Sequence, residues 1–267
     1  MGYPLALSDE ERTRYRFMAA NARRTEAGLW EAAGIIEGAE VADVGCGPGA
    51  VLAALARVVG PTGRVVGVDS DPQAVEWANE EVIQFPQASA CVGNASDSGL
   101  ELGFFDVAMC RHVLLHNGPA EQDIVDHLAD LVRPGGAVYL VDSFGPATSM
   151  WPDEPLLSQL NDAYMQLLSN KANDMRAGLR MGALLQGAGL EVEHFAADAP
   201  VFQVPAGLRP PAWAARLQLV KEGVASLDDV ERWAKRLAEF DRLEERPWFF
   251  AATFVAVGRK PERDLSI

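Results

Sequence analysis

Short apolar runs alternate with amphipathic helical stretches through the first half of the chain. Residues 41–44 form a mostly apolar run that enters a glycine-dense turn, and residues 50–59 then place apolar side chains at helical spacing. Residues 64–68 and 88–92 are further β-rich runs, with a helical stretch over residues 72–82 between them. Strands that alternate with helices in this way are typical of an α/β fold with a doubly wound parallel sheet.

The same periodicities predict the remaining elements. Ser8 and Glu11 have the spacing of a capping box, so a helix should begin there. Later strands are expected over residues 105–110, 137–142, 190–195 and 248–257, and later helices over residues 119–132 and 174–185. Residues 144–173 and 200–247 interrupt this alternation as two insertions, and the second contains two stretches with helical spacing.

The turn after the first strand carries the clearest chemical signal. It contains Gly45, Gly47 and Gly49, and residues without a side chain let a strand turn sharply into a helix while the backbone approaches a ligand. The second strand ends at Asp69, 20 residues after Gly49, where an acid can bind ribose hydroxyls. The glycines alone also fit an ordinary strand-to-helix turn, but together with Asp69 they predict a nucleotide cofactor.

Four motifs resemble the class I S-adenosylmethionine-dependent methyltransferases over roughly residues 40–142. The spacing Asp-x-Gly-x-Gly-x-Gly, from Asp43 to Gly49, has the form of the first motif of that family. Gly93-Asn94-Ala95 stands where the family usually has Gly-Asp-Ala, Phe105-Asp106-Val107 matches its fourth strand, and Arg133-Pro134-Gly135-Gly136 is similar to its Leu-x-Pro-Gly-Gly signature.

This resemblance implies a Rossmann-like α/β fold with seven strands, mostly parallel, and helices on both faces. It divides the chain into an N-terminal helical cap over residues 1–34, a cofactor-binding core over residues 35–142, and residues 143–267, which complete the same domain. The insertions over about residues 144–173 and 200–247 follow strands five and six, and in the family such insertions build acceptor pockets.

The resemblance also implies residues that contact S-adenosylmethionine and its product, S-adenosylhomocysteine. Asp69 and Ser70 would hold the ribose, and Asn94 and Ala95 would hold the adenine. The methionine part would be held by the first motif, namely Asp43, Gly45, Cys46, Gly47 and Gly49. Asp97 is an alternative to Asn94. Tyr15 is expected either in a lid over the cofactor or as a packing residue, and Arg111 is expected to contact the cofactor through its backbone or its side chain.

Methyl transfer from a sulfonium needs a general base only when the acceptor must lose a proton. His116 is the candidate, because it follows the fourth strand and imidazole titrates near neutral pH; hydrogen bonding to the acceptor and plain packing are the alternatives. His112 and His116 are four residues apart, but no third metal ligand is evident and no metal is expected. Trp151, Phe202, Trp213 and Trp233 are candidates for an apolar acceptor pocket.

The amino-acid composition indicates the cellular compartment and the kinds of partner that the protein can bind. The formal net charge is -15 without any run of Lys and Arg, which disfavours nucleic acid. The three cysteines form no Cys-x-x-Cys and are expected as free thiols in a reducing cytoplasm. No apolar run is long enough to cross a membrane, and no secretory leader is expected. The sequence leaves a homodimer open.

The sequence therefore predicts an S-adenosylmethionine-dependent methyltransferase with a small-molecule acceptor, including the tailoring of secondary metabolites. O-, N- and C-methylation all stay open. One alternative is a protein of the same fold that catalyses another reaction, such as a cyclisation, because a fold does not fix a reaction. A second is a nicotinamide-dependent oxidoreductase that uses the same loop and Asp69. A third is a binding or regulatory protein without turnover.

Overall fold

A computed structural model of the 267-residue chain describes residues 8–262. Its strands form one sheet in the order β3-β2-β1-β4-β5-β8-β6, with the short β7 paired to β8. The strands are β1 (Glu40–Val44), β2 (Arg64–Asp69), β3 (Ala88–Val92), β4 (Phe105–Arg111), β5 (Val132–Trp151), β6 (Glu191–Asp198), β7 (Val201–Gln203) and β8 (Trp248–Arg259). The first five strands in this order run parallel, and β8 is antiparallel to its neighbours. The predicted Rossmann-like α/β fold is confirmed, with β7 as an additional short strand.

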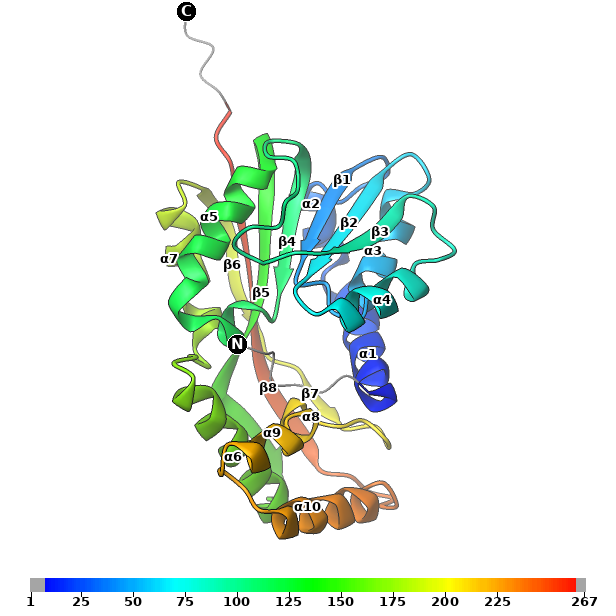
Figure 1. The fold of residues 1–267 in the computed structure, drawn as a ribbon, viewed down its shortest axis with the longest axis vertical. Coiled ribbons are helices and arrows are strands. Elements are labelled where there is room, and N and C mark those ends of the chain that lie inside the picture. The colour runs from blue at the N-terminus through cyan, green and yellow to red at the C-terminus, as the bar shows by residue number, and fades with distance from the viewer. Residues whose placement is uncertain (1–7, 263–267) are drawn as a thin grey trace, which may run out of the picture.

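Helices cover both faces of this sheet (Figure 1). They are α1 (Asp9–Thr25), α2 (Ala27–Ala33), α3 (Ala50–Val59), α4 (Pro72–Glu81), α5 (Glu121–Leu131), α6 (Pro155–Asn170), α7 (Ala177–Gly187), α8 (Pro211–Ala214), α9 (Arg216–Lys221) and α10 (Leu227–Phe240), with 3-10 turns η1 (Leu114–His116) and η2 (Gly118–Ala120). No helix among the described residues is both long and apolar enough to cross a membrane.

Successive side chains of each strand point to opposite faces of the sheet, so the hydrophobic core has two layers, one on each face. Val41 and Tyr139 pack with α2 and α3 on one face, whereas Ala42 and Leu140 pack with α5 and α7 on the other. All four side chains are fully buried. Central parallel strands are apolar on both faces because helices cover both sides of the sheet. The carboxyl ends of β1, β2 and β4 consequently meet at one edge of the sheet.

The N-terminal helix begins at the predicted cap, but the capping box is only half formed. Ser8 Oγ accepts a hydrogen bond from the Glu11 backbone N at 3.3 Å. The Glu11 carboxylate instead accepts two bonds from Arg14, at 2.9 and 2.7 Å. Both side chains of this pair are buried, and Arg14 lines the cavity described below.

The first insertion differs from the prediction. β5 does not end near residue 142 but continues to Trp151 alongside β8, with Phe144 opposite Ala252 and Trp151 opposite Trp248. A shift in register between Phe144 and Ser149 interrupts this pairing. β5 and β8 therefore extend beyond the parallel sheet as a ribbon, and α6, α8, α9 and α10 gather around its far end (Figure 1).

Candidate functional site

A cavity of about 1070 Å³ lies between the carboxyl edge of the parallel strands and the ribbon with its helices. One part of its wall comes from α1, the glycine turn and the residues that follow β2, β3 and β4. The other part comes from the ribbon, α6, β6, β7 and the segment that leads into α8. Ligands of open α/β sheets bind beyond the carboxyl ends of the strands, so the cavity lies where this topology favours a site.

The glycine turn forms a tight corner of the cavity. Gly45 has a φ of 80°, and a Cβ atom there would lie 2.2 Å from Val113 Cγ2. The backbone N atoms of Gly45 and Cys46 donate to the Val68 carbonyl at 2.7 and 3.0 Å, which fixes the turn against β2. Gly45, Cys46 and Gly47, which the resemblance assigns to the cofactor, line the cavity.

Gly49 lies outside the residues that line the cavity. It precedes α3 with a φ of 83°, and a Cβ atom there would lie 2.6 Å from the Cα of Ala78 on α4. The close approach of two helices explains this glycine without a ligand, since backbone at that distance cannot yield to a methyl group.

Two acids lie at the ends of neighbouring strands. Asp43 is 2% exposed, and burial raises its pKa to about 7 while the charge of Arg111 opposes that shift. Its Oδ2 atom is buried without a hydrogen-bond partner among the described residues. Asp69 instead accepts from the backbone N of Gly47 at 2.9 Å and from that of Asp71 at 3.0 Å, so it joins the glycine turn to the start of α4. Burial also raises the pKa of Asp69.

The residues expected near the adenine and ribose also reach the cavity. Ser70, Asn94 and Ala95 all line it, whereas Asp97, the alternative to Asn94, does not. Backbone hydrogen bonds of 3.2 Å join Asn94 and Asp97 in both directions and close the turn that presents Asn94.

Arg111 lines the cavity, but its guanidinium is held by Glu26 between α1 and α2. Nη1 and Nη2 donate to the two carboxylate oxygens at 2.6 and 3.0 Å, and the Tyr139 hydroxyl and Trp30 Nε1 donate to the same carboxylate. Burial opposes the charge of Arg111, but Glu26 raises its pKa overall. Glu26 also lines the cavity, and no motif in the sequence identifies it because its partners lie 85 and 113 residues away.

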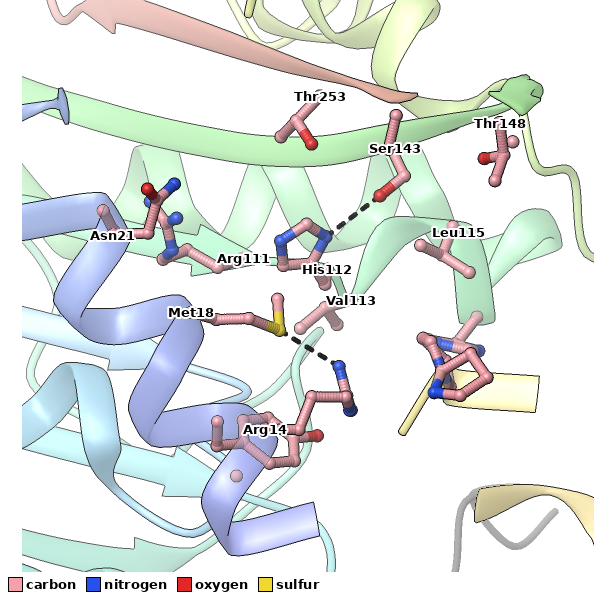
Figure 2. Close-up of a pocket in the computed structure, with 18 of the residues that line it drawn as sticks. Arg14, Met18, Asn21, Arg111, His112, Val113, Leu115, Ser143, Thr148 and Thr253 are labelled. Carbon is pink, nitrogen blue, oxygen red and sulfur yellow. Dashed lines mark hydrogen bonds between the residues drawn. The ribbon is translucent and has the colours of Figure 1, made fainter. Parts of the chain in front are cut away.

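Helix α1 supplies a wall of the cavity. Tyr15 lines it, and its ring would lie 3.3 Å from a Cβ atom at Gly47. The Arg14 guanidinium lies 4.7 Å from the centre of the Tyr15 ring and donates to Met18 Sδ at 3.0 Å (Figure 2). Tyr15 therefore both packs against the glycine turn and faces the cavity.

Both histidines after β4 line the cavity. Burial and Arg14 lower the pKa of His116 to about 3, so its imidazole is neutral at pH 7. His112 has a φ of 54°, which is uncommon outside glycine, and its Nδ1 lies 3.3 Å from Ser143 Oγ (Figure 2). The two histidines do not share an α-helix, so their spacing of four residues does not place both rings on one helix face as metal ligands. Residues 8–262 contain no cluster of three side chains arranged for a metal ion.

The aromatic side chains of the insertions have different surroundings. Phe202 lines the cavity with Phe249, and their ring centres are 5.5 Å apart. Trp213 and Trp233 are buried in the helical packing, and Trp151 is 71% exposed at the end of the ribbon; none of these three lines the cavity.

Comparisons with known proteins agree with the fold and the glycine turn. Residues 41–136 match the family model described as a methyltransferase domain. The ubiquinone biosynthesis O-methyltransferase of Shewanella sp. strain ANA-3 is 31% identical over 112 residues, which cover 41% of this chain and 45% of that protein. The demethylmenaquinone methyltransferase of Staphylococcus aureus strain JH9 is 26% identical over 135 residues, covering 51% and 53%. The chain spans about half the length of the curated relatives it matches.

A solved structure extends the likeness to most of the chain. Phosphoethanolamine N-methyltransferase 2 of Haemonchus contortus, in complex with S-adenosyl-L-methionine, shares the fold with a TM-score of 0.54 at 14% identity. The match covers 90% of this chain and 53% of that one. Residues 41–136 therefore form a methyltransferase domain, and the sheet order of the chain is that of the class I, Rossmann-like S-adenosylmethionine-dependent methyltransferases.

Proposed function

We propose that this protein transfers a methyl group from S-adenosylmethionine to a small-molecule acceptor. The observation that carries the proposal is one continuous cavity that joins the glycine turn to the ribbon and its helices. Its volume of about 1070 Å³ lies just above the range of roughly 300–1,000 Å³ for small-molecule sites, which leaves room for a cofactor and an acceptor together.

The residues at the glycine turn fit the cofactor. Asp43 Oδ2 is buried without a donor, and the ammonium group of the methionine part would supply one. The backbone bonds to Asp69 use only part of its capacity, because two carboxylate oxygens offer about four acceptor sites. Asp69 therefore retains capacity for ribose hydroxyls.

The chain's contribution to the reaction is mainly positioning and exclusion of water. Correct placement of two reactants can supply roughly 7–11 kcal/mol of a barrier. The insertions over residues 144–173 and 200–247 would place the acceptor, since both contribute to the cavity wall. At a pKa of about 3, neutral His116 is too weak a base to deprotonate an acceptor before the methyl group is transferred, which favours a hydrogen bond that orients the acceptor.

The class of acceptor and the cellular compartment are part of the same proposal. The names of the two quinone methyltransferases support a small organic acceptor, and a secondary metabolite is the narrower proposal. Cys46, Cys91 and Cys110 are free thiols, which supports a reducing cytoplasm.

Calorimetric titration tests the cofactor. S-adenosylmethionine and S-adenosylhomocysteine should bind saturably and NADH should not, and Asp69→Ala should weaken binding at least about tenfold, or about 1.4 kcal/mol. Binding of NADH alone would support the oxidoreductase alternative. With an acceptor present, accumulation of S-adenosylhomocysteine separates methyl transfer from a cyclisation, which leaves the cofactor intact.

A further inference from the structure

A row of uncharged polar side chains crosses the cavity wall where its two parts meet. Ser143 on β5 lies directly opposite Thr253 on β8, so both side chains are on the same face of the sheet. His112 follows β4 and places its Nδ1 3.3 Å from Ser143 Oγ. Figure 2 shows these three side chains together on the wall, with Thr148 farther along the ribbon. All four line the cavity.

The backbone holds His112 at this position despite its left-handed conformation. Its N–H donates to the Val141 carbonyl at 2.8 Å, and its φ is 54°. Residues other than glycine in such conformations are strained, and they gather at functional sites. About a quarter of the His112 side chain remains exposed, and the ring lines the cavity.

The arginines that surround the cavity already have acidic partners. Arg14 pairs with Glu11, Arg111 with Glu26, and Arg209 with Asp241. Arg24 is exposed and donates to Asn21. An anionic group bound beside His112 would therefore need Arg14 or Arg111 to leave its acidic partner, which disfavours a carboxylate or a phosphate at the row.

An ammonium group is disfavoured at the row for a different reason. Arg14 and Arg111 place positive charge near His112, and this charge adds to burial in lowering the pKa of the imidazole to about 3. The same positive charge would oppose a cationic acceptor at the row. The Asp142 carboxyl has its Oδ1 atom 3.9 Å from His112 Nδ1, but it is fully buried and already accepts from the backbone N atoms of Ser143 and Leu115. The exposed carboxylates of the wall, Asp162 and Asp198, lie on α6 and at the end of β6.

We propose that His112, Ser143 and Thr253 form a hydroxyl-recognition site, and that the acceptor is an uncharged molecule with an apolar ring system and a hydroxyl group. This inference rests on the proposed function and narrows it to O-methylation. Phe202 and Phe249 supply the aromatic surface for the ring system. His112 and Ser143 bind the hydroxyl, which donates to one of them.

The proton balance is compatible with a weakly basic imidazole. The acceptor oxygen forms a bond to the methyl carbon, and the carbon–sulfur bond breaks with its electron pair passing to sulfur. As the new bond forms, the hydroxyl proton becomes strongly acidic, because a protonated ether is a far stronger acid than an imidazolium. Neutral His112 can then take the proton and release it to solvent, so its low pKa does not prevent the step.

Fluorescence titration of the complex with S-adenosylhomocysteine tests the site with three probes. They are 1-naphthol, its methyl ether 1-methoxynaphthalene, and the cationic 1-naphthylmethylamine. We expect 1-naphthol to bind at least tenfold more tightly than either of the others. His112→Gly, which suits the left-handed backbone, and Ser143→Ala should reduce this preference to less than threefold. Thr148→Val removes a hydroxyl elsewhere in the cavity and should preserve the preference.

Each outcome decides the inference. Equal binding of the three probes, tighter binding of the amine, binding of none of them, or a preference that survives His112→Gly would overturn the hydroxyl site. Calorimetry with S-adenosylhomocysteine alone separates this failure from failure of the proposed function. If the product binds and the probe preference is absent, only the hydroxyl site is wrong; if the product does not bind, both are wrong.

Discussion

Replacement of Arg111 by Met should destabilise the protein strongly while its fold is retained. Arg111 and Glu26 have only 10% and 11% of their side-chain surfaces exposed, and two hydrogen bonds join them. Met fills similar space but leaves the Glu26 carboxylate without its counter-charge in a desolvated position. The removal of one partner from a buried pair costs more than the removal of both.

The remaining hydrogen bonds to Glu26 place the expected loss of unfolding free energy at the lower end of the usual range for a broken buried ion pair. Removal of one partner from a buried pair typically costs 3–5 kcal/mol, but Tyr139 and Trp30 still donate to Glu26, at 2.9 and 3.3 Å, so we expect about 3 kcal/mol. Each kcal/mol shifts the Tm of a chain of this size by roughly 2–4 °C, so the melting temperature should fall by about 6–12 °C.

Urea denaturation followed by circular dichroism measures this loss, with calorimetric melting as a second probe. The double variant Glu26→Leu/Arg111→Met removes both charges and should recover at least about 1 kcal/mol relative to Arg111→Met. A loss below about 1 kcal/mol in the single variant, or a double variant that is less stable than the single one, would refute this account of the pair.

Two other perturbations test the glycine turn and the acids around it. Because burial raises the pKa of Asp43 to about 7, the free protein holds a proton there below that pH, and the cationic cofactor selects the ionised form. The affinity for S-adenosylmethionine, measured by calorimetry, should therefore increase with pH up to about 7 and then level off, and Asp43→Asn should flatten the profile; an unchanged profile would contradict the role of Asp43. Gly49→Ala should cost several kcal/mol in urea unfolding, because its methyl group meets Ala78 at 2.6 Å in addition to the φ strain of roughly 1–3 kcal/mol. Gly99→Ala, with a φ of 71° and nothing within 4 Å, is the matched control and should show the φ strain alone; equal losses would contradict the packing argument.

The cofactor half of the fold was predictable because its signals are local. The apolar runs of β1, β2 and β3 and the glycines between them lie within a few residues of the elements they specify. Gly49 shows what a sequence motif leaves open, because the motif specifies a glycine at this position but not which atoms that glycine contacts. The sequence placed Gly49 with the cofactor, whereas the structure turns it toward Ala78.

The acceptor half was less predictable because pairing between distant strands builds it. β5 continues past Gly145 and Pro146 only because β8, about 100 residues later, pairs with it beyond the irregularity in register. The alignment of Ser143 with Thr253 depends on that register and has no signature within either strand. The left-handed backbone of His112 likewise follows from its neighbours and not from its residue type.

Helix α1 contacts both halves of the cavity, and its contacts differ in strength along its length. Near its start, Glu10 accepts from Trp213 Nε1 at 3.0 Å on the acceptor side. In its middle, exposed Arg16 pairs with Glu81 of α4 at 2.6 Å. Exposed pairs of this kind contribute roughly 0–1 kcal/mol, whereas the buried contacts of Glu26 just after the helix contribute more. The buried contacts of Glu26 therefore anchor the C-terminal end of α1 more strongly than the exposed Arg16–Glu81 pair anchors its middle.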